Sequence, residues 1–158
     1  MSTPEPPEVQ PELFEGPPAD AVARMSVSAP SERNPKLAGF LEAANADVQL
    51  KAWWYAAQAM ADRLGMSDHS WVHVRIVLNV ALRLYRLLRQ HDVEPAMMAT
   101  HRMRSADAEV VIAAACLLHD VGMSVHRSDH EAFSLFLADR KLRQLLDEIG
   151  RASCRERV

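Results

Sequence analysis

Histidine and aspartate side chains that could hold a metal come together most clearly at His119-Asp120. The pair ends an uncharged run from Val110 to Leu118, and Gly122 follows two residues later. Because Gly122 suits the position just past a helix end, Asp120 is expected in the last turn, where the helix dipole disfavours a carboxylate. A buried carboxylate there needs a compensating cation. A metal ion held by both side chains explains the pair better than protonated His119 alone.

Further histidines lie near the starts of two other expected helices. His69 and His73 are four residues apart and share a helix face, whereas His126 and His130 follow the central pair along the chain. We expect His73 and His130 to face the core, because apolar residues recur in register with them. Helix ends can meet at one place in an antiparallel bundle, so these groups can converge. The residues in register are Ile76, Val77 and Val80 for His73, and Phe133 and Leu137 for His130.

Helical periodicity and capping residues account for all regular structure that the sequence predicts, so the expected fold class is all-α. No alternating strand pattern of useful length occurs. Helices are expected at about residues 34–46, 47–64, 67–90, 95–100, 105–121 and 128–149. Their expected N-caps include Asn34, Asp47, Ser67 or Asp68, Ser105, and Ser128 in a Ser-x-x-Glu capping box, and Gly65 is expected to end the second helix.

The two helices around the histidines carry the clearest predictions about burial. The uncharged run 110–118 predicts a helix that is apolar on all sides and central to the fold. The long helix 67–90 carries a polar stripe, which we expect to face solvent, and an apolar stripe, which we expect to face the core. The polar stripe is Arg75, Asn79, Arg83, Arg86 and Gln90, and the apolar one is Val72, Ile76, Val80, Leu84 and Leu87.

Composition divides the chain into three parts. Residues 1–33 are rich in proline and glutamate and predict a disordered extension. Residues 34–149 carry the helical periodicity and form the predicted domain. Residues 150–158 have four charges and no apolar helical face, which indicates a foreign or unstructured tail.

The chain has 158 residues and a net charge of −3, so no basic balance favours a nucleic-acid partner. No signal peptide is evident, and the longest apolar run is too short to cross a bilayer. The two cysteines form neither a zinc spacing nor a disulfide framework. These features favour a reduced, cytoplasmic protein without a membrane partner, and they leave homo-oligomerisation open.

An inward histidine, a later His-Asp followed by Val-Gly, and further histidines before a helix resemble the HD-domain superfamily of metal-dependent phosphohydrolases. The segment 63–74 also looks like the first-histidine segment of one prokaryotic HD subfamily. The resemblance covers about residues 35–149 and implies an HD-like helical bundle. It also implies that His73, His119 and Asp120 bind a divalent metal ion, with Mn, Fe, Zn and Mg as the candidates that suit such ligands.

The resemblance further implies roles for His126 and His130, which match positions where some HD proteins hold a second metal or contact the phosphate. Asp120 could also orient the attacking water or accept its proton. The expected substrate is a small phosphate ester such as a nucleotide or cyclic nucleotide. Two departures are visible: Met123 stands where many relatives have a phosphate-contacting lysine, and the family's final Asp ligand belongs to a later helix, so we expect a C-terminally truncated domain.

Structural roles remain open for each of these residues. His73 could be a hydrogen-bonded core histidine, and His119-Asp120 could be a capping or local ion pair. His126 could be an ordinary loop residue, and His130 could simply occupy the first turn of a capped helix. The alternative to a phosphohydrolase is therefore a non-catalytic HD-like binding or regulatory module.

Overall fold

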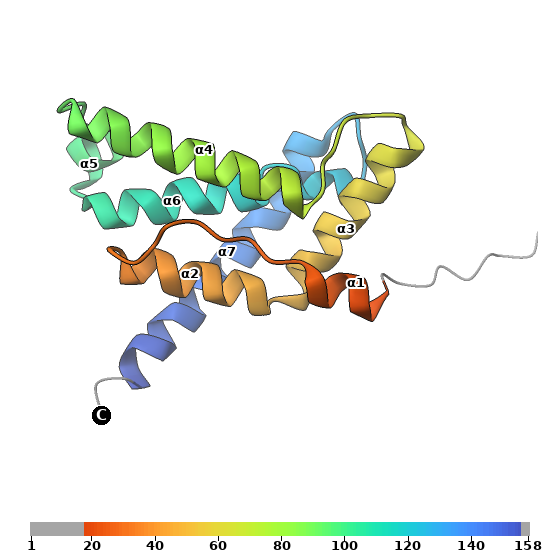
Figure 1. The fold of residues 1–158 in the computed structure, drawn as a ribbon, viewed down its shortest axis with the longest axis horizontal. Helices are drawn as coiled ribbons and strands as arrows, with labels where there is room; N and C mark the ends of the chain where they lie inside the picture. Colours follow the sequence, from red (N-terminus) through yellow and green to blue (C-terminus); the bar gives the residue numbers. More distant parts are fainter. Residues whose placement is uncertain (1–17, 156–158) are drawn as a thin grey trace, which may run out of the picture.

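The computed structural model describes residues 18–155, and side chains as far as Glu148. All regular structure in this range is helical, which confirms the all-α prediction. None of the described helices is long and apolar enough to cross a membrane. The elements, drawn in Figure 1, are α1 (Ala19–Arg24), α2 (Pro35–Ala46), α3 (Val48–Arg63), α4 (Trp71–Gln90), α5 (Ala96–His101), α6 (Ser105–Leu118), the 3-10 helix η1 (Val121–Ser124) and α7 (His130–Arg155).

Local capping sets several helix boundaries where the sequence predicts them. The Asn34 side chain accepts a hydrogen bond from the backbone N–H of Leu37 to start α2, and Asp47 accepts one from Leu50 to start α3. Gly65 follows α3 with a φ of 63°, the left-handed conformation that glycine adopts at little cost.

Three predicted N-caps differ by one to three residues. The cap of α4 is Ser70, whose hydroxyl accepts from Val72, and Asp68 instead accepts a hydrogen bond from the Ser70 N–H. The cap of α6 is Arg104, and α7 begins at His130 rather than directly after Ser128.

The core lies among α2, α3, α4, α6 and α7. α4 and α6 run side by side, and α7 crosses α2 and α6 at a steep angle (Figure 1). Trp54 of α3 is 2% exposed, and its indole N–H donates to the Leu117 carbonyl at 3.0 Å, which ties α3 to the last turn of α6. η1 is packed between α3 and α7, so the chain that leaves α6 is held on two sides.

The predicted core face of α4 is wrong. Ile76, Val80 and Leu84 are 56–61% exposed. α4 carries two apolar stripes at helical spacing, and only its contact with α6 decides which of them is covered. The covered stripe is Val74, Leu78, Leu82 and Tyr85.

α6 is central, as predicted, but its apolar surface is not covered on all sides. Leu117 and Ala113 are fully buried, whereas Val111 is 40% exposed. The more exposed face of α6 and the neighbouring face of α7 line an apolar cavity of about 630 Å³, which His119 borders at one end. Helix α7 covers this side only partly, because it crosses α6 steeply rather than running along it.

Residues 18–33 are packed on the domain, which corrects the prediction of a disordered extension as far as residue 33. Val22, Met25 and Val27 are 8%, 5% and 0% exposed. Asn45 fixes the segment, because its side-chain oxygen accepts from the Val27 N–H and its amide donates to the Val27 carbonyl. Three apolar side chains and this backbone pairing offset the ordering cost that the proline content suggested. Residues 1–17 lie outside the described residues.

The backbone of α7 continues to Arg155, beyond the predicted helix end at 149. The predicted unstructured tail is therefore helical as far as it is described, and residues 156–158 lie outside the described part. A foreign origin of residues 150–158 stays a prediction. Earlier in α7, Lys141 is 1% exposed, and its ammonium group lies 2.7 Å from the Asp47 carboxylate, which anchors α7 to the start of α3.

Candidate metal centre

Helix ends bring most of the predicted site residues to one place. His73 lies in the first turn of α4, and His119 and Asp120 form the link between α6 and η1. His130 is the first residue of α7. The sequence predicted that these helix ends meet, and in the structure the ligand atoms of His73, His119 and Asp120 lie within 4.8 Å of one another.

Asp120 is the centre of the group. One carboxylate oxygen, Oδ2, lies 2.8 Å from Nε2 of His119 and 3.6 Å from Nε2 of His73, and Oδ1 lies 3.8 Å from Nε2 of His130. The Asp120 side chain is 14% exposed. No lysine or arginine pairs with it among the described residues, so the imidazole rings are its recorded counter-charges.

Backbone carbonyls fix which nitrogen two of these histidines present. A carbonyl oxygen only accepts hydrogen bonds, so Nδ1–H of His119 donates to Cys116 at 2.9 Å, and Nδ1–H of His130 donates to Arg127 at 2.8 Å. In both rings Nε2 is the nitrogen turned toward Asp120. This arrangement is typical of metal-binding histidines, whose second nitrogen is held by a carbonyl or carboxylate behind the ligand.

The pKa values of the central pair shift in opposite directions. The hydrogen bond from His119 to Asp120 raises the pKa of His119 above its ordinary 6.5, and this effect outweighs burial. Burial acts to raise the pKa of Asp120, but the hydrogen bond and charge of His119, with smaller effects of His69 and His73, bring it below its ordinary value. Without a metal, the site therefore favours an ionised carboxylate beside a protonated imidazole.

Gly122 has a different role from the predicted helix C-cap. α6 ends at Leu118, and Gly122 belongs to η1, where a Cβ atom would lie 2.0 Å from the His130 carbonyl oxygen. Its N–H donates to the hydroxyl of Ser134 at 2.9 Å. η1 and the first turn of α7 are thus in backbone contact, which fixes Asp120 relative to His130.

Ser134 was not foreseen as a site residue. It is 5% exposed and lies one helical turn after His130, and its hydroxyl accepts the hydrogen bond from Gly122. Only its spacing of four residues from His130 could have indicated a role at the site, and a serine at that spacing is common in any helix.

The remaining predicted residues lie at the edge of the group or away from it. His69 precedes α4 and stacks on His73, with ring centroids 5.8 Å apart. His126 is exposed, its Nδ1 accepts a hydrogen bond from the Ser128 N–H, and no described contact joins it to Asp120. Met123 of η1 is fully buried, so its side chain packs in the protein interior and is not exposed to solvent beside the histidines.

Comparison with known proteins gives one informative match. The uncharacterized protein MJ1020 of Methanocaldococcus jannaschii is 36% identical to this chain over 76 residues. The match covers 48% of this chain and 29% of that relative, so this chain aligns with less than a third of the relative's length. No family model and no solved structure matches the chain.

Proposed function

We propose that this chain carries the metal-binding core of an HD-type phosphohydrolase, acting on a phosphate ester such as a nucleotide or cyclic nucleotide. One observation carries the proposal: His73, His119 and Asp120 offer two imidazole nitrogens and a carboxylate oxygen within 4.8 Å of one another. These are the same three residues that the resemblance to HD proteins assigns to metal binding. Such a nitrogen and oxygen donor set, without thiolate, suits Mn, Fe, Zn or Mg.

The groups around His73, His119 and Asp120 also suit metal binding. The carbonyls behind His119 and His130 hold Nδ1, so Nε2 of each ring faces Asp120 and is the nitrogen that would bind a metal, and Asp120 has no lysine or arginine partner among the described residues. A bound divalent ion would lower the pKa of a water molecule and neutralise charge on a phosphoryl oxygen. In this proposal His130, whose Nε2 lies 3.8 Å from Asp120 Oδ1, would contact the phosphate or help to hold a second metal.

The alternative function is a non-catalytic binding or regulatory module that retains the fold, with or without the metal. The family's final carboxylate ligand belongs to a later helix, and Met123 is buried where many relatives have a phosphate-contacting lysine. The two functions differ in one measurement, because only the hydrolase cleaves a phosphate ester bond.

The test is metal binding and hydrolysis by the wild-type chain and by Asp120→Asn. Removing the carboxylate should weaken Mn or Zn binding at least about a hundredfold, since losing groups behind metal ligands already costs 10–100-fold. Binding should also weaken as the pH falls, because histidines must lose a proton to bind. The raised pKa of His119 places the start of this loss above the ordinary value of 6.5. Titration calorimetry and elemental analysis measure both effects.

The matched control is His101→Asn, which removes an exposed histidine at the end of α5. It should bind metal as the wild type does, and circular dichroism should show that both variants are folded. Wild-type metal affinity in folded Asp120→Asn contradicts the proposal. Metal binding without hydrolysis of any nucleotide or cyclic nucleotide, also in a longer form of the protein, favours the binding module.

A further inference from the structure

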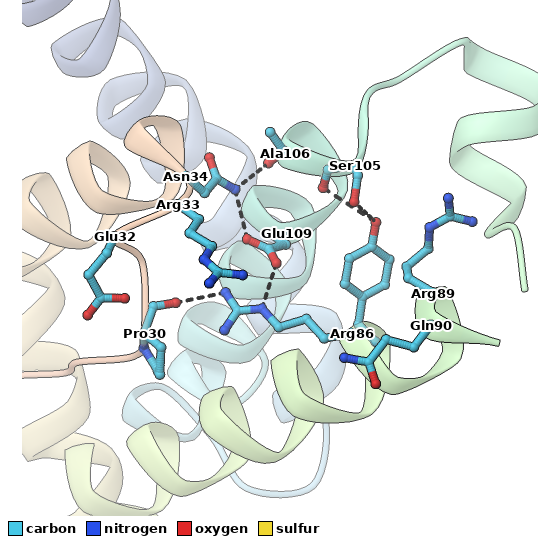
Figure 2. A pocket seen from close by; sticks show the side chains of 11 residues that line it. Pro30, Glu32, Arg33, Asn34, Arg86, Arg89, Gln90, Ser105, Ala106 and Glu109 are labelled. Carbon is cyan, nitrogen blue, oxygen red and sulfur yellow. Dashed lines mark hydrogen bonds and ion pairs between the residues drawn. The ribbon is translucent and has the colours of Figure 1, made fainter. Parts of the chain in front are cut away.

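A second pocket lies at the other end of α4 and α6 from the candidate metal centre. It has a volume of about 600 Å³ and is lined by the turn before α2, the last turns of α4 and the first turns of α6 (Figure 2). His73 and Arg86 are thirteen residues apart on α4, which corresponds to roughly 20 Å at 1.5 Å per residue. The pocket is therefore separate from the metal centre and does not depend on it.

Buried hydrogen bonds build one wall of this pocket. Glu109 is 9% exposed, and its two carboxylate oxygens accept from Arg86 Nε at 2.7 Å and from Asn34 Nδ2 at 2.8 Å. Arg86 Nη2 also donates to the Pro30 carbonyl at 2.7 Å. Both oxygens of Glu109 are thus engaged, and the guanidinium of Arg86 is held in one orientation with Nη1 left over.

Tyr85 also lines the pocket. Its hydroxyl lies 2.8 Å from the Ser105 hydroxyl, so the ring is fixed between α4 and the start of α6. Tyr85 is 7% exposed and presents little polar surface. The pocket thus combines a fixed cationic wall with a fixed aromatic one, the mixture that small-molecule sites commonly show.

Charge in the pocket is unevenly balanced. Three arginines line it, Arg33, Arg86 and Arg89, together with two glutamates: Glu109 pairs with Arg86, and Glu32 adds a weaker attraction to the same guanidinium. Arg89 donates to the Val93 carbonyl, and no carboxylate among the described residues pairs with Arg33 or Arg89. Figure 2 shows Arg33 extending from the turn before α2 toward Arg86, and Glu32 lines the pocket from the same turn. An anion beside Arg33 would pair with a guanidinium that has no carboxylate partner among the described residues.

We propose that this pocket binds a small phosphorylated molecule, with its phosphoryl oxygens on the guanidinium groups of Arg33 and Arg86. A guanidinium presents a planar fork of donors that matches phosphate, and a fork held in place loses little freedom on binding. Arg89 lies on the same pocket and adds positive charge at its rim. The volume exceeds what phosphate alone needs and falls in the range of small-molecule sites, so the ligand carries an organic part.

The test uses inorganic phosphate as the probe, on the full chain with EDTA present so that no metal contributes. Titration followed by amide NMR should give saturable shifts at Asn34, Ser105 and Ala106, with a dissociation constant of about 1 mM or below. Arg33→Gln should weaken binding about tenfold, the loss expected for one charge-assisted hydrogen bond. Arg89→Gln, the second variant, should weaken it by a smaller factor, because its effect is long-range.

Two controls separate this site from general charge and from the metal centre. Arg140→Gln removes an exposed arginine on α7 and should leave phosphate binding unchanged. Asp120→Asn should also leave it unchanged. Thermal melts verify that each variant is folded. The proposal is overturned if the wild type gives no saturable shifts at the three amides, if Arg33→Gln binds normally, or if Arg140→Gln weakens binding equally.

Discussion

At the residue scale, the main feature is a carboxylate held among three imidazole rings. Asp120 has the Nε2 atoms of His119, His73 and His130 at 2.8, 3.6 and 3.8 Å. An ionised Asp120 therefore needs either a protonated His119 or a metal ion beside it. The proton and the metal ion compete for Nε2 of His119. Metal uptake should release protons for this reason.

Gly122 decides how accurately Asp120 is placed. Gly122→Ala should destabilise the protein by about 3 kcal/mol, because the new methyl group would lie 2.0 Å from the His130 carbonyl oxygen and 2.5 Å from the Ser134 nitrogen. Backbone atoms cannot turn aside as a flexible side chain can, so η1 must move away from α7. Metal affinity should fall as well, since that movement displaces Asp120 from His130.

Chemical denaturation and metal titration measure both effects, and Gly65→Ala is the control. Gly65 has a φ of 63° but no neighbouring atom within 4 Å of an added Cβ. Its substitution should cost about 1–2 kcal/mol through backbone conformation alone, with metal affinity intact. If Gly122→Ala were no more destabilising than Gly65→Ala, the close packing of η1 on α7 would not be essential.

At the scale of elements, α4 and α6 act as a pair with a polar connection at each end. At one end they carry His73 and the link to Asp120, and at the other Arg86 bonds to Glu109. Burial acts to raise the pKa of Glu109, but hydrogen bonds from Arg86 and Asn34, with the charge of Arg86, bring it below its ordinary 4.5. The ionised carboxylate is thus the form that joins the two helices to the start of α2.

This pair predicts a specific pH dependence of stability. A carboxyl group with a lowered pKa in the folded state stabilises the fold above pH 4.5, and this contribution is lost as the pH falls through its folded-state pKa. Glu109→Gln should therefore lower the free energy of unfolding by about 1–2 kcal/mol at pH 7. This value already allows for solvent screening, because the Arg86 side chain is 34% exposed. The cost should shrink below pH 4.

Urea denaturation at pH 7 and at a pH near 3.5 provides the measurement. Asp139→Asn serves as the control, because Asp139 forms an exposed pair with Arg143 on α7 and should change the free energy of unfolding very little at either pH. An equal cost of Glu109→Gln at both pH values would show that the carboxylate charge does not stabilise the contact.

At the scale of the whole molecule, the segment before α2 is part of the domain. It runs along the helices in Figure 1, and its backbone groups form hydrogen bonds with side chains of α2 and α4. The Asn79 amide donates to the Ser28 carbonyl, and Arg86 donates to the Pro30 carbonyl. The polar stripe of α4 is consequently not a purely solvated face, because two of its members hold this segment.

Val27→Ala tests how much this packing contributes. Val27 is completely buried in the main core, so losing two methyl groups should cost about 2 kcal/mol. Val48→Ala removes the same groups from a side chain that is 69% exposed and should change the free energy of unfolding by about 0.5 kcal/mol or less. Equal effects in urea denaturation would mean that the segment is bound only loosely.

The sequence by itself determined the fold class, most helix boundaries and the residue types of the candidate metal centre. These features depend on neighbours along the chain. Asn34 and Asp47 cap the N–H groups three residues later, and His119 and Asp120 follow directly on the apolar helix that positions them. The convergence of His73 with that pair was also predicted, because antiparallel helices bring opposite ends together.

Only the tertiary structure decided which surfaces are covered and which polar groups meet. α4 has two apolar stripes of the same period, so the position of α6 alone selected the one containing Leu78. The sequence predicted Gly122 as a helix cap because residues near it in the chain give no sign that α7 packs against its Cα. Val27 and Glu109 found partners far along the chain, in Asn45 and Arg86. Burial and long-range pairing follow from where whole elements pack, whereas capping and periodicity act within a few residues.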